Sequence, residues 1–393
     1  MSSNLETVIS DLPSDWNMLT VSNLIDEGIL ERPMDGNHGG KHPKGSDYVI
    51  EGIPFVMATD INNGKIDYAN CKYISKNLAD SLDKGFAHVG DVLLTHKASL
   101  GRTAIVGTIS SPYIMLTPQV TYYRVRDRER LNNSFLKYYF DSPFFQDTLV
   151  NHGDSGSTRA YVGITAQKEL PILLPPLPEQ RAIAAVLYSL DDKIDLLHRQ
   201  NKTLEAMAET LFRQWFVVEA DEGWEEGKLE LIMKLSNGKS RPNSSGLIPV
   251  YGGNGILDYT DQSNYEDESI IIGRVGAYCG SLFFENNKIW VSDNALHAKA
   301  RNDQENYFLF YLLKTLDLNS FAEGSSHPLL TQTLLNSIDI TIPPAERRQE
   351  FNTLSKILNS KTISNQIQIR TLESLRDTLL PKLMSGEVRI KCQ

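Results

Sequence analysis

One stretch, residues 175–215, limits the possible folds of this chain more than any other. Three prolines open it, and because proline fixes φ and donates no backbone hydrogen bond, they end whatever precedes them. Neither glycine nor proline then occurs until Gly223. Apolar residues recur in alternating steps of four and three, with Asn201 in the missing position: Ile183, Leu187, Leu190, Ile194, Leu197, Leu204, Ala208, Leu211 and Trp215. This heptad pattern predicts one helix, roughly 55 Å long at about 1.5 Å per residue, that packs along another long helix.

The partner helix is encoded in the same chain, at residues 342–388. The sequence TLEAMAETLF begins at Thr203, and the similar sequence TLESLRDTLL begins at Thr371. We call the distance along the chain between these two threonines the repeat offset. The proline pair at 175–176 recurs at 343–344 with the same offset. A proline-led helix therefore occurs twice, and each copy follows a globular stretch.

The two globular stretches also resemble each other, feature by feature and in the same order. The matching features are Trp16 and Trp224, the polar loops Asp35–Asp47 and Asn237–Ser245, the segments Ile53–Phe55 and Ile248–Val250, the strands Asp91–Leu94 and Ser269–Ile272, the helical segments Leu136–Phe140 and Leu309–Leu313, and the loops at His152 and Glu323–Pro328. Each match is loose, but their common order before a repeated helix indicates duplication.

We therefore predict an α+β chain with a pseudo-twofold internal repeat. Two globular mixed α/β domains are separated by two long helices that form an antiparallel coiled coil. The predicted limits are 1–174 for the first domain, 175–217 for the first helix, 218–341 for the second domain, and 342–393 for the second helix and the C-terminal tail.

Composition narrows the class of protein. A chain of 393 residues is long enough for two or three domains with their own cores. The formal charge of −10 argues mildly against nucleic acid as a partner, although phosphate contact requires only a local basic face. No apolar run approaches the ~20 residues that span a bilayer, and the polar, acidic N-terminus is not that of a signal peptide. Cys71, Cys279 and Cys392 lie in no metal-binding spacing, so we expect a cytoplasmic protein with free thiols.

Several segments carry a resemblance to a known family. They are LPPLPEQRAI at 174–183, LFRQWF at the end of the first helix and LLPKLMSGEV at the end of the second. Together with the duplicated layout and with LPSDW, GIPFV and IPVYGGNGI, they make this chain resemble the specificity subunit of type I restriction-modification systems over essentially its whole length. The second copy departs from the pattern, with PPAERRQ in place of PPLPEQR.

The resemblance implies a non-catalytic DNA reader whose two domains are target-recognition domains, each reading one half of a bipartite sequence. The paired helices would set the distance between the domains and dock two methyltransferase subunits. Those partners would use S-adenosylmethionine to methylate adenine, and a restriction subunit could join them for cleavage that depends on ATP and Mg²⁺. By the same resemblance, this chain itself binds no cofactor.

The heptad periodicity also predicts a register for the helix pair. If Asn201 faces Asn365 across an antiparallel pair, the numbers of partner residues sum to 566, and Trp215 meets Phe351. A buried asparagine pair fixes register at some cost in stability. The alternative is that both asparagines are solvated.

Candidate DNA contacts lie in polar, glycine-rich loops at matching places in the two domains. Lysine and arginine would hold phosphates, while arginine, asparagine and serine can also reach base edges. In the first domain the candidates are His38, Lys41, His42, Lys44, Lys97, Arg102, Ser157 and Arg159. In the second they are Lys239, Ser240, Arg241, Asn254, Arg274 and His327. For any one of them the alternative is a solvated loop side chain.

Apparent catalytic motifs fail on inspection. Gly238-Lys239-Ser240 resembles the end of a phosphate-binding loop, but that motif needs glycine where Met233 stands. The Asn/Asp-Pro-Pro-aromatic tetrapeptide of adenine methyltransferases is missing, because both Pro-Pro pairs are flanked by aliphatic residues. The histidines show no zinc spacing. These observations predict a binding protein rather than an enzyme.

A second hypothesis from another class stays open: a protein-interaction scaffold, or an orphan modulator of a methyltransferase, without direct DNA readout. The two hypotheses differ in the loops. A DNA reader should gather basic loop residues on one concave face, whereas a scaffold should present apolar patches there.

Overall fold

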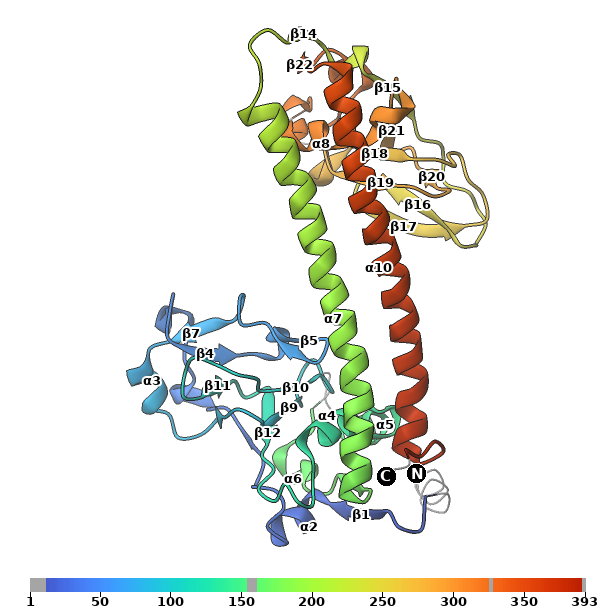
Figure 1. Cartoon of the computed structure of the whole chain (residues 1–393). Helices are drawn as coiled ribbons and strands as arrows, with labels where there is room; N and C mark the ends of the chain where they lie inside the picture. The colour runs from blue at the N-terminus through green and yellow to red at the C-terminus, as the bar shows by residue number, and fades with distance from the viewer. Residues whose placement is uncertain (1–11, 154–160, 325–327, 391–393) are drawn as a thin grey trace. The chain divides into compact units, whose positions relative to one another are not determined.

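A computed structural model describes residues 12–153, 161–324 and 328–390. The chain divides into two compact units, which we call the first unit (Met1–Asp195 with Arg370–Gln393) and the second unit (Leu196–Ile369). The two long helices are α7 (Leu177–Arg213) and α10 (Ala345–Ser385), and each contributes one end to each unit (Figure 1). None of the described helices is long and apolar enough to cross a membrane.

The first unit contains short strands in two main sheets, of order β10-β9-β12-β2 and β3-β7-β4-β11-β8, together with the pairs β1-β13 and β5-β6. Its strands are β1 (Asn17–Thr20), β2 (Met34–Asp35), β3 (Tyr48–Val49), β4 (Ile53–Val56), β5 (Ile61–Asn62), β6 (Lys65–Ile66), β7 (Lys72–Ile74), β8 (Phe86–Ala87), β9 (Val92–Thr95), β10 (Thr103–Ile105), β11 (Ile114–Leu116), β12 (Val120–Tyr123) and β13 (Pro171–Leu174). Its shorter helices are α2 (Val21–Asp26), α3 (Lys76–Asp80), α4 (Asn133–Asp141), α5 (Pro143–Asn151) and α6 (Ile164–Gln167).

Aromatic residues of α4 and α5 form the centre of the core of the first unit. Asn132 caps α4 by accepting the Phe135 backbone N–H at 2.9 Å, and the apolar residues that follow are buried. Phe140 and Phe145 stack with ring centroids 4.3 Å apart. The start of α7 and the end of α10 join this core through Ile183, Leu187, Leu383 and Met384. Both long helices are therefore integral parts of the unit.

The second unit repeats this plan with sheets of order β15-β21-β18-β19 and β17-β16-β20 and the pair β14-β22. Its strands are β14 (Glu225–Lys228), β15 (Met233–Asn237), β16 (Ile248–Gly252), β17 (Gly255–Thr260), β18 (Ser269–Gly273), β19 (Leu282–Glu285), β20 (Trp290–Val291), β21 (Ala295–Ala300) and β22 (Asp339–Ile342). Its shorter helices are α8 (Asn306–Thr315) and α9 (Gln332–Asn336). An aromatic cluster ties its core to the long helices, with Phe212 of α7 packing on Phe308 of α8 and Phe351 of α10.

The register of strand pairing confirms the predicted internal repeat. In the first unit Asn17 pairs with Leu174, and in the second Glu225 pairs with Ile342, which lies one repeat offset after Leu174. The strands at Ile53 and Ile248 each pair in parallel with a later strand, β4 with β11 and β16 with β20. The α+β fold class with two mixed helix-and-strand units is thus confirmed.

The two long helices begin at equivalent residues in spite of their different opening sequences. Helix α7 begins at Leu177, and α10 begins one repeat offset later, at Ala345. In α7 the buried Gln180 side chain donates to the Pro175 carbonyl oxygen at 2.8 Å. In α10 the equivalent Arg348 donates to the Pro343 carbonyl oxygen at 2.6 Å. A different side chain therefore makes the same contact in each copy, and the change from PPLPEQR to PPAERRQ leaves the helix start in place.

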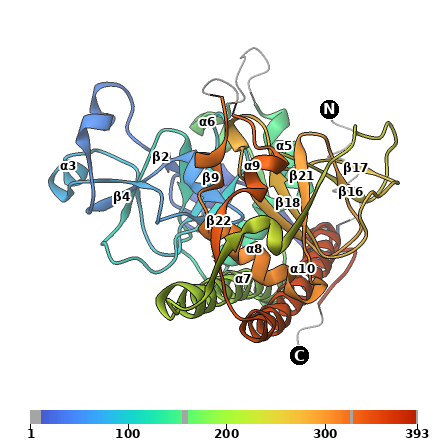
Figure 2. The ribbon, with the colours of Figure 1, turned by 90° about the horizontal axis from the view of Figure 1, so that it is seen from above.

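Within each unit α7 and α10 run antiparallel, side by side (Figure 1 and Figure 2). In the second unit the Asn365 side chain is fully buried and donates to the Asn201 side-chain oxygen at 2.9 Å. Trp215 and Phe351 pack with ring centroids 6.2 Å apart. These are contacts that the register with a sum of 566 requires.

Candidate nucleic-acid interface

Three segments meet at one end of the sheet β10-β9-β12-β2 in the first unit. They are the loop after β2, the residues directly after β9, and the segment at Tyr161 and Val162. The Val162 N–H donates to the His96 carbonyl oxygen at 3.0 Å, and Lys97 forms an isolated antiparallel bridge with Tyr161. This arrangement brings the candidate loop at 36–47 and the candidate Lys97 to the same edge of one sheet, because β2 and β9 both pair with β12.

Asp35, the last residue of β2, anchors this edge. It is 3% exposed, and its carboxylate lies 2.6 Å from His38 Nε2 and also accepts the Lys84 ammonium. Burial by itself would raise the pKa of Asp35, but the hydrogen bonds from Lys84 and His38 outweigh burial and hold the pKa below its usual value. His38 is thereby oriented by a buried anion.

The loop after β2 is fixed to the loop at residues 82–85 by polar contacts. The Asn37 side chain donates to the Lys84 carbonyl oxygen at 2.6 Å and accepts the Asp83 N–H at 3.1 Å. Lys41 forms an exposed ion pair with Asp83. A Cβ atom at Gly36 would lie 1.8 Å from a backbone carbonyl oxygen, so the loop can leave the strand here only through glycine.

His96, which directly follows β9, lies beneath this surface. It has no exposed area, and its Nδ1–H donates to the Val162 carbonyl oxygen at 3.0 Å. Its Nε2 lies 4.0 Å from an Asp35 oxygen and has no hydrogen-bond partner among the described residues. Burial lowers the pKa of His96, so the ring is neutral near pH 7. Above it, the Lys97 ammonium lies 5.7 Å from the centroid of the Tyr161 ring.

The second unit builds the same three-way junction from equivalent residues. Asn237 ends β15 as Asp35 ends β2, and Arg274 follows β18 as His96 follows β9. The Leu330 N–H donates to the Arg274 carbonyl oxygen at 2.9 Å, which repeats the contact of Val162 with His96, and Leu330 lies one repeat offset after Val162. A Cβ atom at Gly238 would again lie 1.8 Å from a carbonyl oxygen.

The chemistry of the two junctions differs although their backbones correspond. In the second unit the Arg274 guanidinium is half-buried and donates to the Asn237 side-chain oxygen at 3.3 Å. Its Nε is buried without a partner among the described residues. The first junction therefore pairs a buried carboxylate with a neutral imidazole, whereas the second pairs an amide with a guanidinium that can contact a ligand.

The remaining candidates of the first unit fall into two groups. Lys44 is exposed in its loop, and its backbone N–H donates to Asp47 at 2.7 Å. His42 and Arg102 make internal contacts: the His42 ring packs 5.5 Å from the Phe55 ring, and Arg102 Nη1 donates to Asn62 at 2.9 Å. Ser157 and Arg159 lie outside the described residues.

The remaining candidates of the second unit are mostly free for contact. Lys239, Ser240 and Asn254 are exposed, and the Lys239 backbone is held by the parallel bridge of that residue to Ser292. Arg241 is also exposed and lies 3.7 Å from an Asp258 oxygen. His327 lies outside the described residues.

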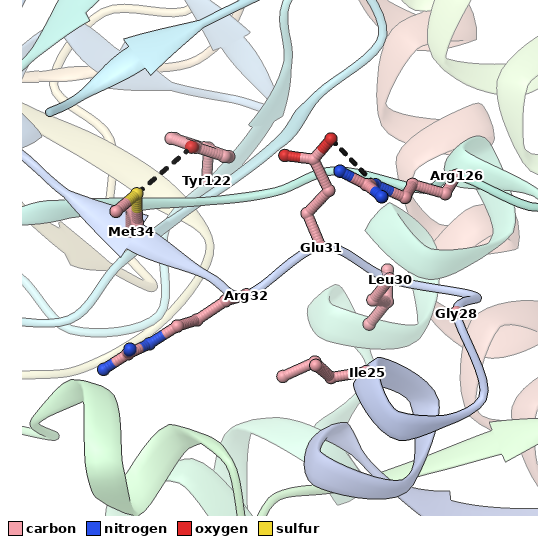
Figure 3. Close-up of a pocket in the computed structure, with 8 residues that line it drawn as sticks. All are labelled: Ile25, Gly28, Leu30, Glu31, Arg32, Met34, Tyr122 and Arg126. Carbon is pink, nitrogen blue, oxygen red and sulfur yellow. Dashed lines mark hydrogen bonds and ion pairs between the residues drawn. The ribbon is translucent and has the colours of Figure 1, made fainter.

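An open hollow in the first unit contains an arginine that sequence reasoning missed. The hollow is lined by Ile25, Gly28, Leu30, Glu31, Arg32, Met34, Tyr122 and Arg126 (Figure 3). Arg126 donates to Glu31 at 3.0 Å, while Arg32 points away from that pair and forms no ion pair with a described residue. Arg32 lies two residues before β2, with Pro33 between, and it was missed because an arginine beside proline outside a glycine-rich loop gives no sequence signal.

The buried residues that organise the junctions were also missed. Asp35 and His96 carry the geometry of the first site, but single polar residues at strand ends are common in sequences. Alignment of the two repeats is the signal that could have found them, because Asp35 and Asn237 share a place before Gly36 and Gly238. No group of three or more His, Cys, Asp or Glu residues in the described part of the chain is placed to hold a metal ion.

The chain is similar to known proteins in sequence and in fold. A family model described as the type I restriction modification DNA specificity domain matches residues 37–206 and 221–373. The type I restriction enzyme MjaIX specificity subunit of Methanocaldococcus jannaschii is 26% identical, and the match covers 98% of this chain and 96% of that protein. The putative MjaX specificity subunit of the same organism is 23% identical, with the same coverage. A solved structure of a type I restriction-modification system S subunit from M. genitalium matches 98% of this chain and 99% of that chain, with a TM-score of 0.64 at 18% identity.

Proposed function

Because this chain belongs to the type I restriction-modification DNA specificity family, we propose that it reads a bipartite DNA target, one half with each unit. The junction built twice is the observation that carries this proposal. Each unit presents loops from equivalent strand ends, yet the side chain after the strand differs: it is the buried His96 in the first unit and the half-buried Arg274 in the second. Two units with the same backbone arrangement but different polar side chains are suited to a target whose two halves differ in sequence.

Within each unit the contacts divide by role. Exposed lysines such as Lys44, Lys97 and Lys239 suit phosphate oxygens, which position a protein on DNA without reading sequence. Arg274 suits a base edge, because a guanidinium can donate two hydrogen bonds to guanine O6 and N7 in the major groove. Its contact with Asn237 orients the group before DNA arrives.

The internal repeat also supports a proposal about protein partners. A chain with two equivalent helix starts, at Leu177 and Ala345, presents two similar surfaces and could therefore dock two copies of the same methyltransferase subunit. Those subunits would supply S-adenosylmethionine chemistry on adenine, and a restriction subunit would add cleavage driven by ATP with Mg²⁺. In this proposal the chain itself contributes recognition and no catalytic group.

Replacement of Lys239 and Arg241 by alanine tests the DNA-reading role. In the assembled complex, K239A/R241A should weaken binding to target DNA and lower the salt dependence of log K by up to about two units, because each phosphate contact contributes about 0.9. Binding should be titrated at several salt concentrations. K288A is the matched control, since Lys288 is exposed, forms an ion pair with Glu266 and is not one of the candidate contacts. Unchanged affinity and salt slope for K239A/R241A would contradict the proposal.

A further inference from the structure

The segment that follows α10, Gly386–Arg389, is joined to the start of α7 and to the segment before β1 by the guanidinium of Arg389. We call this contact the closure of the first unit. Arg389 donates to Glu179 Oε1 at 3.0 Å and Oε2 at 2.6 Å, and to the two Asp15 oxygens at 2.9 and 2.7 Å. Glu179 is 4% exposed and also accepts the Trp16 indole N–H at 3.1 Å. One cation therefore pairs with two carboxylates, one of them buried, at the start of α7.

Gly386 lets the segment reach this position. Its φ of +75° is a backbone conformation that side chains other than glycine rarely adopt. A Cβ atom there would lie 2.5 Å from Cγ of Pro13. A larger residue would thus suffer both backbone strain and a clash with the segment that leads into β1.

The equivalent closure of the second unit has the opposite polarity. There Arg347, which lies one repeat offset after Glu179, supplies the cation from the start of α10, and Glu219 after α7 supplies the anion at 2.6 Å. The Arg347 guanidinium also lies 5.9 Å from the centroid of the Trp224 ring, the counterpart of Trp16. Both units therefore join the end of one long helix to the start of the other by an ion pair with reversed charges, although the anion of the second unit is Glu219 and not Asp221, the counterpart of Arg389.

The repeat offset identifies the residues after α7 that correspond to the segment after α10. They belong to the first half of the chain, which ends at Glu222, and would meet the first unit of another copy if two first halves paired. Val218 is the counterpart of Gly386, and Asp221 is the counterpart of Arg389. If the first half of another copy placed the end of its α7 against Glu179, the β-branched side chain of its Val218 would meet Pro13. It would also add a carboxylate beside two others without any cation.

We propose that Gly386–Arg389 is a recognition segment through which the first unit accepts the end of α10 and rejects the end of α7 from a second copy of the chain. The partner that fits this surface is the second half of the chain, and a second first half does not fit. Pairs of identical first units, which would present two identical junctions, are thereby excluded. The inference does not depend on the proposed reading of DNA.

A nicked full-length chain tests this selectivity. A protease site inserted between Glu222 and Gly223, both exposed, allows the folded chain to be cleaved into two halves. After unfolding and refolding of the cleaved protein, native mass spectrometry should detect mixed pairs of halves and no pairs of first halves. V218G/D221R gives the first half the glycine and the cation that it lacks, and it leaves Arg389, Arg347 and Glu219 themselves unchanged. Pairs of first halves should then increase roughly tenfold or more, as expected when a buried carboxylate gains a charged hydrogen-bond partner.

V218A/D221N is the matched control, because it changes the same positions without supplying the glycine or the cation, and it should form mixed pairs only. R389Q provides a second measurement: mixed pairs that carry it should exchange their halves at least about tenfold faster than the wild type. The proposal is overturned if wild-type first halves pair with each other as often as with second halves. It is equally overturned if V218G/D221R refolds without forming such pairs, or if R389Q leaves the exchange rate unchanged.

Discussion

His297 illustrates how a buried neutral group couples the stability of the second unit to pH. Its ring stacks on Tyr265 with centroids 3.6 Å apart, and its two nitrogens lie 3.3 Å from the Ser236 hydroxyl and 3.1 Å from the Ser269 hydroxyl. Burial, with a smaller contribution from Lys299, lowers the pKa of His297 from 6.5 to about 4. Every polar atom of the ring therefore has a neutral partner, and protonation in the folded state is unfavourable.

This predicts a loss of stability in mild acid. Between pH 6.5 and 4 the unfolded state binds more protons than the folded state, so the free energy of unfolding should fall as the pH falls. The stabilisation that neutral His297 contributes is roughly 3 kcal/mol. It is fully present above pH 6.5 and is lost as the pH falls to about 4. Urea unfolding of wild type and H297Q from pH 7.5 to 4 measures it. H297Q should show a shallower pH dependence, and parallel curves would refute the assignment.

At the scale of single residues, the sequence predicted exposed loop residues better than the buried residues that position them. Lysines in glycine-rich loops, such as Lys44 and Lys239, give a compositional signal. Asp35 and His96 give none, because their role depends on β2 and β9 pairing with the same strand, β12. His42 was chosen for its loop position, but its ring packs against Phe55, which a sequence does not reveal.

At the scale of elements, the asparagine pair between α7 and α10 should fix the register of the two helices and lower the free energy of unfolding. The Asn365 amide donates to Asn201, while its own side-chain oxygen is buried without a partner among the described residues. Such an oxygen carries a desolvation cost that an apolar residue would not. The pair therefore stabilises one alignment of the helices more than it stabilises the fold.

Two variants separate these effects. N365L should destabilise the second unit by about 1–3 kcal/mol, because it leaves the Asn201 side-chain oxygen without its donor. N201L/N365L should recover that loss and exceed wild type, since replacing both partners by apolar groups is neutral or stabilising. Equilibrium unfolding in urea gives the three free energies. A double variant that is no more stable than N365L would contradict this account.

The helices and their register were the part of the fold that the sequence predicted best. A heptad pattern is local and periodic, so it can be recognised in the sequence. The segment TLESLRDTLL at Thr371 repeats TLEAMAETLF at Thr203 and thereby identified the partner helix. The strands were less accessible because many are only two to four residues long, and a run such as β2 carries no readable period. The closure of the first unit by Arg389 could not be predicted, because it joins residues that lie 374 positions apart at Asp15 and 210 apart at Glu179.

At the scale of the whole molecule, duplication with divergence is the property that matters for function. The two units share strand registers, helix starts and the glycine that opens each loop, and these shared features maintain the scaffold. The polar side chains of the junctions differ between the units, as in the exchange of His96 for Arg274. A chain built in this way can alter one recognition surface without disturbing the core of the other unit.

This separation predicts that a change in one junction alters one half of the target. R274A should relax base selectivity in one half-site by about 1–3 kcal/mol, the value of a bidentate arginine contact, and should leave the other half-site unchanged. Mapping methylated adenines in a genome that carries this chain and its partner subunits measures both halves at once. K97A, in the first unit, is the matched comparison: Lys97 is assigned to a phosphate, so K97A should weaken methylation at every site and change neither half of the sequence methylated. If R274A relaxed both halves equally, the two junctions would act on one shared sequence. A general loss of affinity could not produce that result, because it would weaken methylation at every site without changing the sequence methylated.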